Sequence, residues 1–254
     1  MKHLYKDRFF ADPFILDIKN DVIEVLVEEF IYKEWKGRIT LLTVDRNSFE
    51  LVSRKVLLDL KTHLSFPFIF RENTQIYVAP ENSKSGQFSI YEYDDNKQQL
   101  TYVNALVKLP LVDSIIYKFD NQYFILGSIQ NGNENRELYL WTSDSLFGIY
   151  TPNEGILVKQ GYSSSRRAGD IFLSNNELYS ASQSCVKSYG EKLYINSILK
   201  ITNSEFKEKS ILSYSPQSPY DEGIHTFNTY KGMCVVDGLS YLFLPQYKLN
   251  RLLK

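Results

Sequence analysis

Short apolar stretches recur along the whole chain, and polar turn residues bound them. Runs of apolar or alternating residues at positions 22–27, 75–78, 122–126 and 233–236 are each about the length of a strand. No convincing helical period of 3.6 residues is sustained anywhere in the sequence. The pattern therefore predicts an all-β protein with many short strands.

These runs belong to a unit that repeats about every fifty residues. Each unit opens on a short apolar strand, turns at a small or polar residue, and continues with further strands. The five openings lie near Asp12, Phe66, Asp113, Asp170 and His225. The five turns centre on Asp21, Asn73, Asn121, Asn176 and Gly232.

A four-stranded unit repeated radially is typical of a β-propeller blade. Five openings predict a five-bladed propeller, with blades of about four antiparallel strands, as one domain over residues 1–254. The fifth unit is short of strands after residues 241–244. We expect the N-terminal segment to supply the missing strand and close the ring, because closure removes exposed sheet edges.

Composition supports a globular β protein and narrows its partners. The chain holds 19 Tyr and 16 Phe, which suit a pleated surface, and 43% apolar residues are enough for a core. A net charge of -1 without a basic run excludes nucleic-acid binding through bulk charge. No apolar stretch approaches the ~18–20 residues that cross a bilayer, and residues 1–8 lack the apolar core of a signal peptide. We expect a cytoplasmic protein without a transmembrane segment, whose cysteines, Cys185 and Cys234, are free thiols.

Several stretches resemble a known group of propellers. They are residues 11–16, 64–70, 76–81, 110–114, 144–148, 166–170 and 223–228. They look like the five-bladed propellers of the glycoside hydrolase family 43 type, and more closely like the N-terminal propeller of glucosamine inositolphosphorylceramide transferases and bacterial relatives. The resemblance implies a carbohydrate-active protein of surface-polysaccharide or glycoconjugate biosynthesis, with a glycosyltransferase or another biosynthetic enzyme as a candidate partner.

Three acidic residues are candidate catalytic groups, because the inner strands of a propeller converge at one mouth of its axial channel. They are Asp12, Asp113 and Asp170. Glycoside cleavage takes two carboxyl groups whose pKa values are pushed apart. By the resemblance, Asp12 falls at the general base and Asp113 near the general acid, normally a Glu, while Phe66 replaces a pKa-tuning Asp. The alternative for both aspartates is a turn or capping carboxylate.

Further polar residues are candidates for binding the substrate. They are Glu81, Arg166, Arg167, Gln183, Tyr189, His225 and Asn228. Arginine recognises carboxylate and phosphate through two parallel hydrogen bonds. Neighbours on a strand face opposite sides, so one of the two arginines is expected to reach the channel and favour an anionic ligand. The alternative is a salt bridge to Asp170 or to a neighbouring blade.

His225 is the one histidine on an expected inner strand. The resemblance implies a structural calcium ion near it, although hard cations prefer oxygen ligands, and a hydrogen-bonded histidine is the alternative. No cofactor and no catalytic metal are expected, and His3 and His63 are interpreted as surface or loop residues.

Three functions compete at this point. The first is an enzyme that hydrolyses or transfers a glycosyl unit with the channel carboxylates. The second is a non-catalytic glycan-binding or assembly module, which the loss of the acidic residue at Phe66 favours. The third is a propeller scaffold for protein partners. The separation of two carboxyl groups across an open pocket would discriminate among them.

Overall fold

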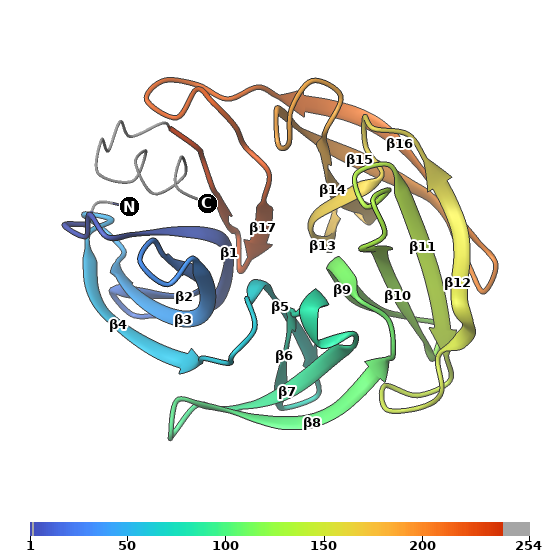
Figure 1. Ribbon diagram of the computed structural model, residues 1–254, viewed down its shortest axis with the longest axis horizontal. Coiled ribbons are helices and arrows are strands. Elements are labelled where there is room, and N and C mark those ends of the chain that lie inside the picture. The colour runs from blue at the N-terminus through green and yellow to red at the C-terminus, as the bar shows by residue number, and fades with distance from the viewer. Residues whose placement is uncertain (2, 241–254) are drawn as a thin grey trace.

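The computed structural model describes Met1 and residues 3–240, which form an antiparallel β-propeller. Four four-stranded sheets stand round a central axis, and the chain enters each of them near the axis and leaves at the rim (Figure 1). The predicted all-β propeller is thus confirmed. The described residues contain one short 3-10 helix, η1 (Ser83–Ser85). No helix in this part of the chain is long and apolar enough to cross a membrane.

The strands follow one another in chain order within each blade. The first blade holds β1 (Arg8–Lys19), β2 (Val22–Ile31), β3 (Lys36–Asp45) and β4 (Leu51–Leu58). The second holds β5 (Ser65–Glu72), β6 (Gln75–Glu81), β7 (Phe88–Asp94) and β8 (Gln99–Val107). The third holds β9 (Leu111–Phe119), β10 (Gln122–Ile129), β11 (Glu137–Ser143) and β12 (Thr151–Gln160). The fourth holds β13 (Arg166–Ser174), β14 (Glu177–Ser184), β15 (Lys192–Thr202) and β16 (Glu205–Tyr214).

The prediction of five blades is wrong. After the fourth blade the described chain adds a two-stranded sheet of β17 (Phe227–Tyr230) and β18 (Met233–Val236), which packs beside β1 and β13. The N-terminal strand does not complete this sheet either, because β1 pairs with β2 in its own blade. The physical reason is that β17 and β18 have four residues each, too little to build a full blade. Residues 241–244 lie outside the described part of the chain.

The predicted turns connect the first two strands of each unit. Asn73, Asn121 and Asn176 all have positive φ angles, of 55°, 61° and 61°. Asparagine tolerates this left-handed conformation, which tight hairpins require. These local signals explain why the repeat could be read from the sequence.

Each inner strand is interrupted near its start by a bulge. The bulges contain Asp12, Phe66, Asp113 and Gly169, whose φ angles are 51°, 41°, 43° and 150°. A positive φ is costly for a residue with a Cβ, and a bulge re-aims a side chain out of the regular pleat. The four bulges therefore mark the level of the axis at which side chains from different blades meet.

Candidate functional site

Asp12 joins three parts of the propeller at this level. One carboxylate oxygen, Oδ2, accepts a hydrogen bond from the backbone N–H of Phe66 at 3.0 Å. The other, Oδ1, accepts one from the hydroxyl of Thr226 at 2.8 Å and lies 3.2 Å from His225 Nε2. Burial raises the pKa of Asp12, but His225 and the other donors outweigh burial and hold this pKa below its ordinary value. Asp12 is therefore ionised at neutral pH.

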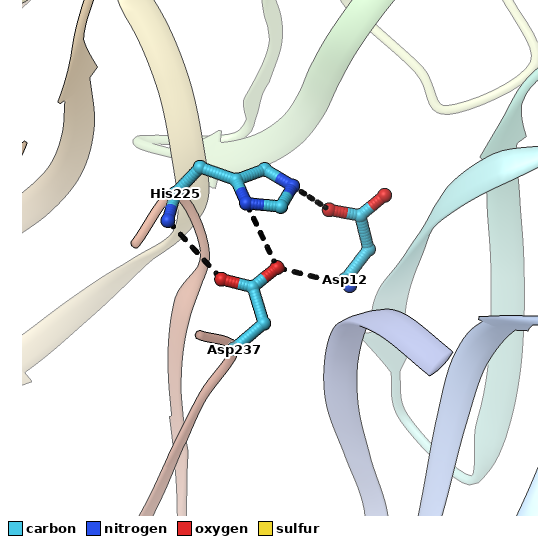
Figure 2. Close-up of side chains that lie close together, drawn as sticks. All are labelled: Asp12, His225 and Asp237. Carbon is cyan, nitrogen blue, oxygen red and sulfur yellow. Dashed lines mark hydrogen bonds and ion pairs between the residues drawn. The ribbon is translucent and has the colours of Figure 1, made fainter. Parts of the chain in front are cut away.

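His225 lies between two carboxylates (Figure 2). Its Nδ1 is 3.1 Å from Asp237 Oδ2, and the second oxygen of Asp237 accepts hydrogen bonds from the backbone N–H groups of His225 and Thr226. Burial lowers the pKa of His225, but Asp237 and Asp12 outweigh it and raise the pKa to about 10. The imidazole is therefore a cation with both ring nitrogens protonated at neutral pH.

A calcium ion near His225 would compete with the proton of its imidazole. Asp12, His225 and Asp237 offer ligand atoms within 4.8 Å of one another, but a protonated imidazole has no lone pair to give to a metal. The carboxylates already neutralise the imidazolium, which takes the place that a cation would have. Without an ion, His225 is a hydrogen-bonded histidine held between Asp12 and Asp237.

Glu81 and Asp113 form the second half of the group. Glu81 ends β6, and its Oε2 accepts a hydrogen bond from the backbone N–H of Asp113 at 3.0 Å. Burial and the negative charge of Asp113 raise the pKa of Glu81 to about 8, against the opposing effect of Arg166. Glu81 is therefore protonated at neutral pH. The negative charge of ionised Asp12 also contributes to its raised pKa.

Arg166 and Gln183 bind the carboxylate of Asp113. Arg166 Nε lies 2.6 Å and Gln183 Nε2 3.1 Å from Asp113 Oδ2. Burial raises the pKa of Asp113, and Arg166 opposes this. The guanidinium carbon of Arg166 lies 4.9 Å from the centre of the Tyr189 ring, which in turn is 5.2 Å from the ring of His225. Tyr189 is 45% exposed, so this side of the group opens to solvent. We call Asp12, Glu81, Asp113, Arg166, Gln183, Tyr189 and His225 the axial cluster.

Three of the predicted site residues lie elsewhere. Arg167 is fully buried inside the fourth blade, where its guanidinium makes two hydrogen bonds to Glu208. Its neighbour Arg166 is the arginine that reaches the axial cluster, as alternation along a strand allows. The backbone N–H of Asp170 is bound by Asn228, which also donates to the carbonyl of Pro13.

Among the described contacts, Asp170 has no hydrogen bond or ion pair with Asp12 or Asp113. Burial raises its pKa to about 7, and its charged neighbour is Arg71. Asp12, Glu81 and Asp113 affect one another's pKa values, whereas the expected trio included Asp170. Asn228, in β17, connects this strand to Asp170 in β13 and to Pro13 in β1, and its hydrogen bonds do not include the axial cluster.

The sequence did not point to some residues that lie beside the axial cluster. Asp237 follows β18 directly and looks like an ordinary turn residue. Glu28 is buried, and burial and Asp12 raise its pKa well above the ordinary value. His63, interpreted as a surface or loop residue, does lie in the loop between β4 and β5, and its Nε2 is 3.5 Å from Glu28 Oε1. The available signal was the set of three acidic residues, Glu24, Glu28 and Glu29, in the mostly apolar strand β2.

The charge state of His225 predicts how stability depends on pH. The raised pKa means that the folded chain keeps the imidazolium proton after the unfolded chain has lost it near pH 6.5. The stabilisation is thus complete below about pH 6.5 and is lost as pH rises to about 10. We expect the difference in unfolding free energy between wild type and His225→Gln to shrink over this range.

Urea unfolding at a series of pH values measures this difference. His63→Gln is the matched control, because burial lowers the pKa of His63, and it is expected to keep the wild-type fall in stability. A difference for His225→Gln that stays constant between pH 6 and pH 10 would show that His225 is uncharged.

Solved structures with the same fold are carbohydrate hydrolases by their names. The catalytic domain of a GH62 α-L-arabinofuranosidase from Coprinopsis cinerea superposes with a TM-score of 0.69 at 10% identity, over 92% of this chain and 86% of that chain. An exo-β-1,3-galactanase from Phanerochaete chrysosporium has a TM-score of 0.61 at 13% identity, over 83% of this chain and 53% of that chain. At these identities the likeness concerns the fold alone.

Sequence relatives come from plants. Glucosamine inositolphosphorylceramide transferase 1 of Arabidopsis thaliana is 29% identical over 216 residues, which are 80% of this chain and 27% of that protein. The protein of the same name from Oryza sativa subsp. japonica is 28% identical over 211 residues, 80% of this chain and 28% of its own length. The chain thus spans about a quarter of the relatives that it matches. Residues 2–233 match the family described as "Glucosamine inositolphosphorylceramide transferase 1, N-terminal", and the chain therefore belongs to this family.

Proposed function

We propose that this chain is a carbohydrate-active protein of glycoconjugate biosynthesis that acts on a glycan or sugar conjugate at the axial cluster. The observation that carries the proposal is the split between two buried carboxyl groups. The pKa of Asp12 is lowered, whereas that of Glu81 is raised to about 8. Such a pair provides one ionised base and one neutral acid at the same pH. The transferase names of the plant relatives support a sugar conjugate as substrate.

Each group has a role in glycosyl transfer. Glu81 gives its proton to the leaving oxygen as the glycosidic bond breaks. Asp12 takes the proton of the attacking hydroxyl, from water in hydrolysis or from an acceptor sugar in transfer. Arg166 and Gln183 hold Asp113 beside Glu81, and the charge of Asp113 keeps the Glu81 proton in place. Glu81 thus takes the acid role that sequence reasoning gave to Asp113.

A non-catalytic glycan-binding module is the second candidate. Asp12 already accepts contacts from Phe66, Thr226 and His225, which leaves it little capacity to take up a further proton. The chain also matches only about a quarter of the plant transferases, so their activity can reside outside the matched part. The cytoplasmic location and the biosynthetic partner enzyme stay predictions.

A ligand screen with product analysis tests the proposal. The chain is mixed with nucleotide sugars, amino sugars and aryl glycosides, binding is recorded by saturation-transfer NMR, and products are identified by mass spectrometry. Catalysis predicts a hydrolysed or transferred product from at least one bound compound. Sugar binding without any product favours the binding module, and the absence of sugar binding would contradict both functions and favour a scaffold.

A further inference from the structure

A group of aromatic rings covers the end of the first blade at which β1 begins. Phe9 on β1 and Phe30 on β2 face each other, and their rings are stacked. The ring centres are 4.9 Å apart, and the angle between the ring planes is 8°. The ring of Trp35, in the turn between β2 and β3, meets Phe30 edge-on at 5.3 Å, and Tyr32 lies 6.1 Å from Phe9. We call Phe9, Phe30, Tyr32 and Trp35 the aromatic strip.

The aromatic strip presents open ring surface to solvent. Trp35 is 70% exposed and Phe9 38% exposed. Trp35 also has a positive φ of 52°, which is a strained conformation for a bulky residue. Burial of its side chain does not offset this strain, because the side chain is exposed. Exposed aromatic rings that neighbouring rings hold in place lose little conformational entropy when they bind a ligand.

A polar link joins the strip to the axial cluster. The ring of His63 lies 6.0 Å from the ring of Phe30, and its Nε2 is 3.5 Å from Glu28. Glu28 pairs across the sheet with Ala11, the residue before Asp12, and Asp12 contributes to the raised pKa of Glu28. The face of β2 that carries Phe30 and Glu28 therefore leads from the aromatic strip to the axial cluster.

The link carries hydrogen-bonding groups whose surroundings disfavour charge. Burial raises the pKa of Glu28 and lowers that of His63, which favours the uncharged form of each group. His63 Nδ1 accepts a hydrogen bond from the N–H of Gly37 at 2.9 Å, which assigns the proton to Nε2 on the side of Glu28. Aromatic surface with a few convergent neutral polar groups suits a sugar ring with its hydroxyls.

We infer that the aromatic strip, His63 and Glu28 form a second sugar subsite, which binds an uncharged sugar ring of a conjugate whose reacting unit lies at the axial cluster. This inference rests on the proposed function and defines its substrate class as a conjugate of two or more sugar rings. A lipid surface is the rival occupant. The turn that carries Trp35 holds Lys33 and Glu34 side by side, whereas docking to an anionic membrane takes an excess of basic residues.

The two tryptophans allow a direct test, because Trp141 is fully buried and Trp35 is exposed. An array of neutral and amino-sugar oligosaccharides of one to four rings identifies the ligands, whose affinities are then measured by tryptophan fluorescence. We expect longer oligosaccharides to shift the Trp35 emission to the blue. Trp35→Asn is expected to weaken their binding about tenfold, the size of one aromatic contact, and to leave monosaccharide binding unchanged.

Phe49→Asn is the matched control. Phe49 is 53% exposed and has a φ of 56° in the turn at the other end of the same blade. The Phe49→Asn variant should therefore bind every sugar as the wild-type protein does. The subsite would be overturned by an unchanged oligosaccharide affinity in Trp35→Asn. It would also be overturned if the wild-type protein bound no oligosaccharide, or if its emission shifted to the blue with phosphatidylcholine vesicles alone. If oligosaccharides bind through Trp35 and no product forms, the subsite stands and the catalytic proposal fails.

Discussion

Replacing Glu81 with glutamine is expected to lower turnover by ~10²–10⁴-fold, the usual contribution of a general acid. Glutamine keeps an oxygen that can accept the hydrogen bond from Asp113 N–H, and it is neutral like the protonated acid, but it cannot give a proton to the leaving group. Substrate affinity is therefore expected to change little. The measurement is kcat and KM on the substrate that the ligand screen identifies.

Glu81→Gln is expected to lower turnover without lowering the stability of the fold. Between pH 4.5 and about 8 the folded chain holds the Glu81 proton that the unfolded chain has released, so wild-type stability falls as pH rises through this range. Glu81→Gln removes this loss and should be at least as stable as wild type at pH 7. Glu72→Gln is the control, because Glu72 pairs with Lys118 away from the axial cluster, and it should keep full turnover. Full turnover in Glu81→Gln would exclude Glu81 as the acid.

Removing Arg167 should destabilise the fold by about 3–5 kcal/mol, because it leaves a buried carboxylate poorly paired. Arg167 and Glu208 both have fully buried side chains and are 2.6 Å apart. Arg167 and Lys159 overcome the effect of burial and lower the pKa of Glu208 to about 2. The stabilisation is therefore present above about pH 4.5 and is lost as pH falls towards 2. Urea unfolding of Arg167→Met at pH 7 measures the effect.

Two further variants separate the ion pair from packing. Arg167→Met combined with Glu208→Leu removes both buried charges and should recover most of the lost stability. Arg46→Met replaces an exposed arginine and should change the unfolding free energy by less than about 0.5 kcal/mol. If Arg167→Met unfolds at the wild-type urea concentration, Glu208 does not depend on Arg167. These results would also place Arg167 among the structural residues of the fourth blade.

The repeat of strands and turns could be predicted from the sequence because its signals are local. Asn73 and Asn121 adopt the left-handed conformation that their turns need, and apolar runs of strand length surround them. The number of blades was not accessible in the same way. The opening near His225 has the pattern of the other units, but the described chain forms only the two-stranded sheet of β17 and β18 there, and strand pairing depends on contacts that no short stretch encodes.

The axial cluster was predictable only in part. Asp12 and Asp113 stand at the start of inner strands, and the geometry of a propeller brings such positions together. Alternation says that Arg166 and Arg167 face opposite sides, but the bulge that follows Arg167 in β13 makes the choice between them a matter of three-dimensional register. The role of Glu81 depends on burial and on the charge of Asp113, which the sequence does not contain.

The proposed mechanism requires Glu81 to be a neutral acid beside an ionised Asp12 at neutral pH. Carbon-13 NMR of side-chain carboxyl groups, recorded between pH 3 and pH 10 on glutamate-labelled protein, measures this most directly. The Glu81→Gln spectrum identifies the signal by its disappearance. We expect the Glu81 carboxyl to titrate with a pKa of about 8. Titration near the ordinary glutamate value of 4.5 would mean that Glu81 is charged at neutral pH and is not the general acid.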